Sequence, residues 1–547
     1  MQVYPTRPAV HLVLAGAAVV LVGLIAREVA LVAWGGALVF AMALARASAL
    51  ASVQRIRSAG FEMLWSGTQR TSTVARGAEF EIEAEVRNRD TRAARYVQLR
   101  PVHSSHLQVR IEPVTGEVPA GGRLRVSVWV KAPRVGRHAV HGLALEVQGS
   151  PGLFEVPLTF ANPYGVEVLP RAFGSMLLTA RGGRSRLGAD EGRPGASPGN
   201  GMELRELREH QPGDAFKRIA WRASAKRGKL LVRDFERDER DVVWIVVDAS
   251  VELWAGEAGM SPLDLGIDEV ASVARRHLSR GDRVGLAIFG GRLRGLLEPE
   301  RGPKHAQDIA LALAIVTGTY DADRSELDER DVALRVIEHL RPLDGKVAGT
   351  ERIDMDKLAF RAEAAMQRAP FRGMAPDAPG MREKVLRRYL ASFGIESPPR
   401  TEPEHRRTEE AMIRFLDRLS QRKPHPSIVH VWSPAPDHPK AELVLAIAKL
   451  RRRSARVYWI PARAEQAVAM GNGGVASVVT EAVVLRSRAA RERGERSLGA
   501  IGVKVERVKR WGVHGAAGHV MAALTSAEDG TVTQKTSSPP SGNRGGK

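Results

Sequence analysis

The amino-terminal part of the chain contains two long apolar runs. They cover residues 9–26 and 29–45, and only Arg27 and Glu28 separate them. A helix of this length crosses the ~30 Å hydrocarbon core of a bilayer. A cleaved signal peptide would have one shorter run before a polar mature chain, whereas here a second run follows at once. The pattern predicts a transmembrane helical hairpin, with a buried helical pair as the alternative.

Charges beside the hairpin predict its orientation. Arg7 precedes the first run, and Arg46, Arg55 and Arg57 follow the second, whereas the tight loop holds one cation and one anion. Cytoplasmic flanks of membrane helices carry an excess of lysine and arginine. We therefore expect both ends of the hairpin, and with them the rest of the chain, on the cytoplasmic side.

Beyond a connector that ends near residue 60, polar and apolar residues alternate. EFEIEAEVRN (79–88) and RLRVSVWVKA (123–132) repeat with period two between Gly, Asn or Pro, which is typical of half-buried strands. Similar short segments are YVQLRPV, LQVRIEP, HAVHGLALEVQ and FEVPLTF. Their near-regular spacing predicts an all-β immunoglobulin-like sandwich over residues 61–175.

Histidines in this module are a candidate metal site. His103, His106, His138 and His141 fall on two separate predicted strands, and no carboxylate cluster accompanies them in the sequence. Zinc sites need ligands that converge on one point. We interpret these residues as satisfied or exposed strand histidines.

Two segments have the composition of irregular chain. Residues 176–202 are rich in Gly, Ser, Pro and Arg without periodicity, which predicts a flexible linker. Residues 513–547 are polar and rich in Pro, Gly and Ser, which predicts a disordered tail.

From residue 241 onward, strand-like and helix-like patterns alternate. The strand-like segments are 241–248, 283–290, 292–299, 427–433 and 456–462, and the helix-like ones are 263–282 and 440–453. Such alternation predicts a doubly wound, Rossmann-like α/β domain. Its binding crevice would lie at the carboxyl ends of the parallel strands.

Further helical patterns separate the strands of this domain. They cover residues 325–340, 355–367, 381–394 and 405–421. An ordinary crossover needs only a short helix, so we expect a helical insertion over about residues 320–425. It is either a lid or partner platform near the crevice, or a packed subdomain without a ligand.

Residues 203–239 read ELRELREHQPGDAFKRIAWRASAKRGKLLVRDFERDE and precede the first of these strands. This segment, the signature, resembles the bacterial family catalogued as domain of unknown function fifty-eight, in which a von Willebrand A-like strand follows. Matching positions are Arg208, Glu209, Pro212, Gly213, Asp214, Arg218, Ile219, Trp221, Ser224, Ala225, Leu230, Val232, Arg233, Phe235 and Glu236. His210, Ala220 and Lys226 depart from the usual Tyr, Asp and Arg.

The residues of the signature allow two interpretations. Pro212-Gly213-Asp214 has the composition of a turn. We expect Arg218 and Arg222 to be helix neighbours and Trp221 to pack inward. The segment then either braces the following domain or forms a docking surface for a partner.

The resemblance implies a von Willebrand A-like domain over residues 203–512, in a protein anchored in the bacterial inner membrane. Members of the family are commonly encoded beside MoxR-type AAA+ ATPases. The resemblance therefore implies such an ATPase as the partner, in a system for assembling or activating other proteins.

The resemblance also implies a metal loop, D-x-S-x-S, in which hydroxyl and carboxylate oxygens hold Mg²⁺. Here the loop reads Asp248-Ala249-Ser250-Val251-Glu252, so a carboxylate replaces the second serine. A later loop offers Thr317 or Thr319 as a third ligand.

The strand 427–433 should end in a second Asp. It ends instead in Ser433 and Pro434, with Asp437 three residues beyond. We therefore expect a degenerate site, with Asp248, Ser250 and Glu252 as its candidate ligands, that binds Mg²⁺ too weakly to matter. Glu252 is alternatively a solvated loop residue, and no other cofactor is expected.

Composition narrows the function classes. The chain has no cysteine, which excludes disulfides and thiolate chemistry, and 82 Lys+Arg against 62 Asp+Glu give a net charge of +20. The basic stretch 486–510 has only Trp511 nearby for base stacking, so we expect lipid contact or a solvated helix and no nucleic acid. No NTPase, metalloprotease or hydrolase motif is present.

We therefore expect a non-enzymatic adaptor. The alternative is a structural envelope protein that self-associates without an ATPase, and a third possibility is an enzyme hidden in the insertion.

Overall fold

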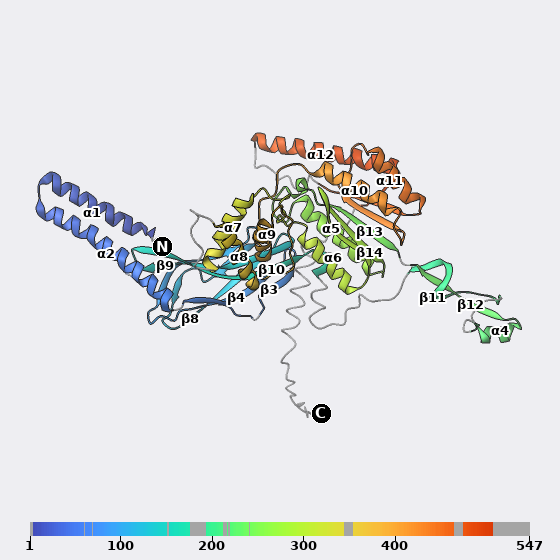
Figure 1. Ribbon diagram of the computed structural model, residues 1–547, viewed down its shortest axis with the longest axis horizontal. Coiled ribbons are helices and arrows are strands. Elements are labelled where there is room, and N and C mark those ends of the chain that lie inside the picture. The colour runs from blue at the N-terminus through green and yellow to red at the C-terminus, as the bar shows by residue number, and fades with distance from the viewer. Residues whose placement is uncertain are drawn as a thin grey trace, which may run out of the picture. The chain divides into compact units, whose positions relative to one another are not determined.

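A computed structural model describes residues 4–59, 61–67, 69–149, 152–174, 193–211, 216, 219–239, 241–343, 354–463 and 474–506 (Figure 1). The predicted tail 513–547, most of the predicted linker and Pro212 to Asp214 lie outside these residues. Along the chain, a helical pair is followed by β-sheets and then by an α/β region.

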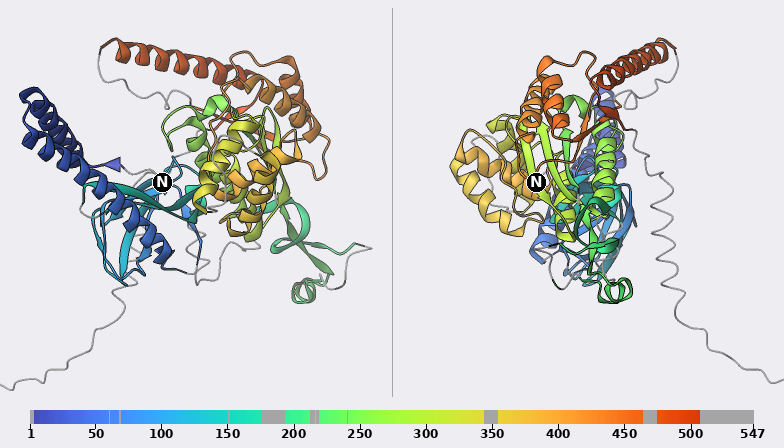
Figure 2. Two further views of the ribbon diagram at one scale, coloured as in Figure 1. Left: turned by 60° about the vertical axis from the view of Figure 1, so that its left-hand side comes forward. Right: turned by 90° about the vertical axis from the view of Figure 1, so that its right-hand side faces the viewer.

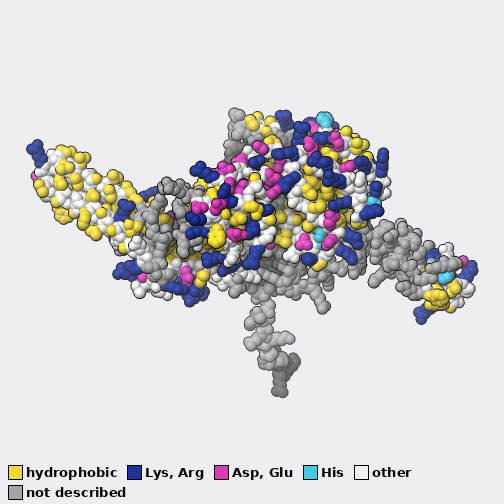
Figure 3. All heavy atoms as spheres, in the orientation of Figure 1, with side chains coloured by type: hydrophobic (Ala, Val, Ile, Leu, Met, Phe, Trp, Pro, Cys, Tyr) yellow, Lys and Arg dark blue, Asp and Glu magenta, His cyan; other side chains and the backbone are white. Residues whose placement is uncertain are grey.

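The two apolar runs form the helices α1 (Arg7–Ala26) and α2 (Val29–Ala59), as predicted. Residues 7–26 and 29–52 are long and apolar enough to span a membrane. Hydrophobic side chains cover the surface of the pair (Figure 3). The helices turn at Arg27, whose φ of 55° is left-handed. They approach closely at glycine, because a Cβ on Gly35 would lie 2.7 Å from the Gly16 carbonyl oxygen.

Both ends of the helical pair are attached to the following β-module. The strand β1 (Tyr4–Pro5) pairs with β10 (Phe154–Leu169). At the other end, Arg55 Nε donates to Asp90 Oδ2 at 2.7 Å. Ala45 and Ala49 of α2 share a small buried cluster with Phe154.

The β-module consists of two sheets. One has the order β1-β10-β9-β5-β7, with β3 also on β10, and the other has the order β2-β4-β8-β6. The further strands are β2 (Glu62–Trp65), β3 (Thr71–Ala75), β4 (Glu79–Arg87), β5 (Ala94–His103), β6 (Gln108–Glu112), β7 (Gly116–Val118), β8 (Arg123–Lys131) and β9 (Gly136–Gly149).

The two sheets share one core, because inward positions alternate with outward ones along each strand. Ile82 and Val128 of one sheet pack in the same buried cluster as Leu99 and Leu145 of the other. The module is therefore a β-sandwich, and its immunoglobulin-like character remains a prediction.

The signature forms a two-stranded sheet with a short helix. The strand β11 (Arg193–Glu209) pairs with β12 (Leu231–Glu239), and α4 (Trp221–Arg227) lies between them in the chain. The predicted linker 176–202 is thus too long, because its last part is strand. The prolines and glycines there are accommodated by irregular register near Gly195 and Gly199.

The α/β region is a six-stranded sheet in the order β15-β14-β13-β16-β17-β18. All neighbours are parallel except β14 and β15, as predicted for a doubly wound domain. The strands are β13 (Val242–Asp248), β14 (Arg283–Gly290), β15 (Arg292–Glu300), β16 (Ile428–Ser433), β17 (Arg456–Pro461) and β18 (Lys504–Val505).

Helices cover both faces of this sheet (Figure 2). On one face, α5 (Pro262–Leu278) and α6 (Pro303–Ile315) share a core with alternate residues of β13 and β14. On the other face are α10 (His405–Leu419) and α11 (Ala441–Arg452). The helix α12 (Gly474–Ala500) precedes the short edge strand β18.

The predicted insertion is smaller than expected. The helices α7 (Glu329–Leu343), α8 (Met355–Ala365) and α9 (Met381–Phe393) form a core of their own. By contrast, Met412 and Leu416 of α10 pack against Trp244 in the central strand. Because α10 is a sheet-covering crossover helix, the predicted end of the insertion at residue 425 is wrong.

Candidate functional site

The candidate site lies where the two central parallel strands end. Asp248 is the last residue of β13, and Ser433 is the last residue of the neighbouring strand β16. A short 3₁₀ helix, η2 (Val251–Trp254), follows the Asp248 loop. This is the edge at which doubly wound sheets form their crevices.

Both carboxylate oxygens of Asp248 are occupied by neighbouring side chains. Asp248 is fully buried. Its Oδ1 accepts hydrogen bonds from the backbone N–H of Ser250, at 3.0 Å, and from the Ser250 hydroxyl. Its Oδ2 accepts from Ser433 Oγ at 2.8 Å and lies 3.1 Å from Nδ1 of His405. A buried carboxylate needs such hydrogen-bond partners, because burial without them costs free energy.

A histidine, His405, lies beside this carboxylate. It is the first residue of α10. The hydrogen bond to Asp248 raises the pKa of His405 above its ordinary value, although burial opposes this shift. The His405 ring therefore lies beside Asp248 Oδ2, one of the oxygens that the degenerate metal loop would offer to a cation.

Two further carboxylates fix the start of α10 to the Asp248 loop. Glu252 Oε1 accepts from the backbone N–H of His405 at 2.8 Å. Glu404 Oε1 accepts from the backbone N–H of Val251 at 3.0 Å. Burial raises the pKa of Glu404. These reciprocal bonds satisfy backbone donors of the loop and of the helix amino terminus.

A buried arginine joins the loop to η2. Arg324 Nη2 donates to the carbonyl oxygen of Ala249 at 2.6 Å and lies 3.6 Å from Glu404 Oε1. Its guanidinium carbon lies 4.5 Å from the centre of the Trp254 ring, which is a cation–π contact. Burial lowers the pKa of Arg324 to about 10, so this side chain remains a cation near neutral pH.

These residues do not fit a Mg²⁺ site. The ion needs about six oxygen ligands at short range. Asp248 is committed to Ser250, Ser433 and His405, and Glu252 bonds the backbone of α10. Within the described part of the chain, no three His, Asp or Glu residues gather in a metal-binding group.

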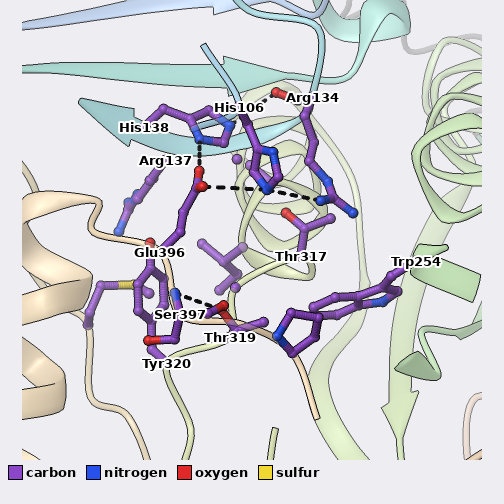
Figure 4. A pocket seen from close by; sticks show the side chains of 16 residues that line it. His106, Arg134, Arg137, His138, Trp254, Thr317, Thr319, Tyr320, Glu396 and Ser397 are labelled. Atoms are coloured by element: carbon purple, nitrogen blue, oxygen red, sulfur yellow. Dashed lines mark hydrogen bonds and ion pairs between the residues drawn. The ribbon is translucent and has the colours of Figure 1, made fainter. Parts of the chain in front are cut away.

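Thr317 and Thr319, which were predicted as possible third ligands, and Asp437, which follows β16, all have partners in other parts of the chain. Thr317 Oγ1 donates to the carbonyl oxygen of Val135, and Thr319 Oγ1 donates to that of Ser397. Asp437 pairs with Arg493 at 3.0 Å. Thr317 and Thr319 (Figure 4) therefore contact the segment before β9 and the segment after α9, and their role as a third metal ligand stays a prediction.

The signature differs from expectation at its tryptophan. Trp221 is 57% exposed, so the prediction that it packs inward is wrong. Its ring lies 6.1 Å from that of Phe216, which is 73% exposed. A seven-residue helix on a two-stranded sheet offers little core in which an indole could be buried. The helix begins at Trp221, so it does not include Arg218, which lies outside the described residues.

Other signature residues hold the segment together. Ser224 is buried, and its Oγ accepts from the backbone N–H of Leu231 at 2.8 Å. Glu209 pairs with Lys229 at 2.9 Å on the surface. Arg208 Nη1 donates to the carbonyl oxygen of Glu209, and Arg233 is exposed. Phe235 and Glu236 lie in β12, and their side chains are outside the described residues.

The sandwich histidines have the partners that their interpretation as satisfied residues requires. His138 Nδ1 lies 2.8 Å from Oε1 of Glu396, a carboxylate contributed from beyond α9. His141 Nδ1 lies 3.1 Å from Nε2 of His339 in α7. Burial lowers the pKa of His141 to about 4, so this ring is neutral near pH 7.

Comparison with known proteins supports the family resemblance that was inferred from the signature. Residues 206–344 match the family "Protein of unknown function DUF58". This DUF58 region contains most of the signature, the Asp248 loop and helices α5 and α6. His405, Glu404 and Ser433, which complete the site, lie outside it.

Curated relatives include "Uncharacterized protein Rv1480" of Mycobacterium tuberculosis and "Uncharacterized protein Mb1516" of Mycobacterium bovis. Each is 29% identical over 147 residues, which is 27% of this chain and 46% of the relative. The chain thus matches less than half the length of these curated relatives.

Solved structures show weaker likenesses. The seventh PapD-like domain of human CEP192 is 15% identical, with coverage of 20% of this chain and 86% of that one and a TM-score of 0.16. Native alpha-2-macroglobulin from Escherichia coli, from domain MG7 to its carboxyl terminus, is 12% identical, with coverage of 80% and 66% and a TM-score of 0.16. Neither likeness carries an argument about this chain.

Proposed function

We propose that this chain is a membrane-anchored scaffold that presents its signature to a soluble partner in the cytoplasm, and that it is not itself an enzyme. The partner that the family resemblance implies is a MoxR-type AAA+ ATPase, acting in the assembly or activation of other proteins. The von Willebrand A-like character of the α/β domain is part of this proposal.

The observation that supports a docking role is the exposed aromatic pair of Phe216 and Trp221. Aromatic side chains dominate the binding energy of protein interfaces. Here they stand beside the exposed cations Arg222, Lys226 and Arg227 of α4. We therefore expect a partner surface with an apolar pocket and an acidic rim.

The binding test uses full-length protein in detergent with purified ATPase. Trp221→Ala should weaken ATPase binding by about 2–4 kcal/mol, as the loss of an interface anchor does. It should change the free energy of unfolding by no more than about 0.5 kcal/mol, because the ring is exposed. Calorimetric titration measures the first quantity and thermal unfolding the second.

Phe360→Ala is the matched control, because Phe360 is 76% exposed on α8. It should leave ATPase binding unchanged. If Trp221→Ala lowers the free energy of unfolding but leaves ATPase binding intact, the signature only stabilises the α/β domain and the docking role fails. Recovery of a homo-oligomer alone from detergent extracts would favour the structural envelope protein.

The proposed orientation has its own test. A reporter fused after Lys547 should be active only in a form that works in the cytoplasm, because Arg46, Arg55 and Arg57 follow the hairpin. A reporter active only in the periplasm would overturn the cytosolic partner.

Metal removal should not affect partner binding. The oxygens of Asp248 are occupied by hydroxyl groups and by His405. We expect the affinity of this chain for the ATPase to be the same in EDTA as in Mg²⁺. The ATPase is held in one nucleotide state with a non-hydrolysed analogue. The metal requirement of the ATPase itself is measured separately. Saturable Mg²⁺ binding to this chain that is lost in Asp248→Ala would contradict this expectation.

A further inference from the structure

Two buried histidines, His277 and His430, face each other within the α/β domain. His277 lies near the end of α5, and His430 lies in the middle of β16. They are 3% and 2% exposed, and their Nε2 atoms are 3.2 Å apart. A hydrogen bond across this distance needs a hydrogen on one Nε2 and a lone pair on the other. The contact therefore exists only while at least one Nε2 atom is unprotonated.

A carboxylate beside each ring fixes where the other hydrogens are. Asp282 Oδ2 lies 2.8 Å from Nδ1 of His277, and Glu506 Oε2 lies 3.0 Å from Nδ1 of His430. An ionised carboxylate only accepts, so both Nδ1 atoms carry a hydrogen. Together with the hydrogen between the two Nε2 atoms, the pair holds three ring hydrogens, which is one more than two neutral rings have. The pair therefore carries one positive charge.

The charged groups around the pair balance this single charge. Asp282 and Glu506 contribute two negative charges, and Arg276 Nη2 donates to Glu506 Oε1 at 2.7 Å. One face of the His430 ring stacks on the ring of Tyr458 in β17, at 5.1 Å between ring centres. One guanidinium and one ring charge thus offset two carboxylates. A second ring charge would be an uncompensated cation at a buried position, which costs free energy.

A fourth ring hydrogen would also break the contact itself. It would take the last lone pair, so that two N–H groups would face each other. Burial lowers the pKa of His430 below its ordinary value of 6.5, although Glu506 opposes this shift. A histidine in the unfolded chain therefore takes up its proton at a higher pH than this ring does. The stability that the contact provides is present above about pH 6.5 and is lost as the pH falls further.

We propose that the pair of His277 and His430 is an acid-sensitive contact, which holds the end of α5 against β16 at neutral pH and releases it when both rings are charged. The end of α5 has other attachments, because Leu278 packs in a hydrophobic core and Arg276 pairs with Glu506. These attachments do not need the Nε2 contact. We therefore expect acid to loosen this end of the helix without unfolding the domain.

The helix and the strand that the pair joins also carry part of the candidate site. Nε1 of Trp432 donates to Glu269 of α5 at 3.2 Å, and Trp432 precedes Ser433 on β16. His430 lies on the same strand. The acid-sensitive contact is thus one of the attachments that set the position of α5 beside this strand.

The first test compares melting temperatures at about pH 7 and about pH 5.5, with full-length protein in detergent. His277→Asn keeps an amide donor toward Asp282 and removes the Nε2 atom, so His430 is then protonated without a facing N–H. The unaltered chain should lose about 4 °C more than this variant between the two pH values, which corresponds to a roughly tenfold change in the folding equilibrium of a domain of this size. His430→Asn removes the opposite ring and should give the same result.

His425→Asn is the matched control, because His425 is an exposed histidine outside the pair. It should lose as much in melting temperature as the unaltered chain. Hydrogen exchange, corrected for the effect of pH on the intrinsic rate, then locates the opening. At the lower pH, residues 275–282 of the unaltered chain should lose about tenfold in protection, whereas residues 242–248 in β13 should keep theirs. His277→Asn should show no such loss.

Two results would overturn the proposal. One is an equal loss of melting temperature in the unaltered chain and in both His277→Asn and His430→Asn. The other is unchanged protection of residues 275–282 in the unaltered chain at the lower pH. The partner ATPase takes no part in either measurement, so their outcome is independent of the docking role.

Discussion

Asp248→Ala is expected to destabilise the α/β domain by about 3 kcal/mol, because it leaves several groups without their partner at once. The hydroxyls of Ser250 and Ser433 are buried and both donate to this carboxylate. His405 would also lose the anion that raises its pKa. The free energy of unfolding of the domain is read from the thermal transition of the full-length protein in detergent.

Asp248→Asn is the matched variant. An amide of the same shape still accepts one hydrogen bond through its oxygen, so we expect a loss of about 1 kcal/mol. Added Mg²⁺ should rescue neither variant. A melting temperature for Asp248→Ala equal to that of the unaltered chain would show that the cluster around Asp248 does not hold the loop.

Gly266→Ala is expected to be comparably harmful, at about 3 kcal/mol, through overpacking. A Cβ at this position in α5 would overlap the six-membered ring of Trp432. That ring is 1% exposed, and its Nε1 donates to Glu269 at 3.2 Å, so it has no free direction in which to move. The gain of about 1 kcal/mol in helix propensity from Gly to Ala is too small to compensate.

This substitution also bears on the candidate site, because Trp432 precedes Ser433 on β16. Gly499→Ala in α12 is the control, since a Cβ there meets nothing within 4 Å. It should leave the melting temperature unchanged or raise it slightly. If Gly266→Ala melts like Gly499→Ala, then the packing of Trp432 against α5 is looser than we describe.

The elements that follow a strong local period could be predicted from the sequence. The alternation in residues 79–88 and 123–132 gave β4 and β8 nearly residue for residue, and the apolar run before Asp248 gave β13. Local periodicity also predicted α10, but not the layer to which it belongs. That depends on contacts of Met412 and Leu416 with a strand far away in the sequence.

The candidate site was predicted only in part, for the same reason. The loop sequence identified Asp248, Ser250 and Glu252, and the missing second Asp indicated a degenerate site. No local signal places His405 beside Asp248, because 157 positions separate them in the numbering. The exposure of Trp221 could not be predicted, because tryptophan is usually well buried. The pattern around it does not show that β11 and β12 pair as a two-stranded sheet within the described residues.

The attachment of the helical pair to the sandwich limits how the protein can be divided. Tyr4 and Pro5 extend one sheet, Thr6 N–H donates to the carbonyl oxygen of Leu153 at 3.0 Å, and Phe154 is covered by residues of the pair. Proteolytic removal of the first 46 residues would therefore take away more than apolar helix, because it would strip an edge from β10 and uncover an aromatic ring. The fragment that remains would be soluble, but we expect it to aggregate more readily than the full chain.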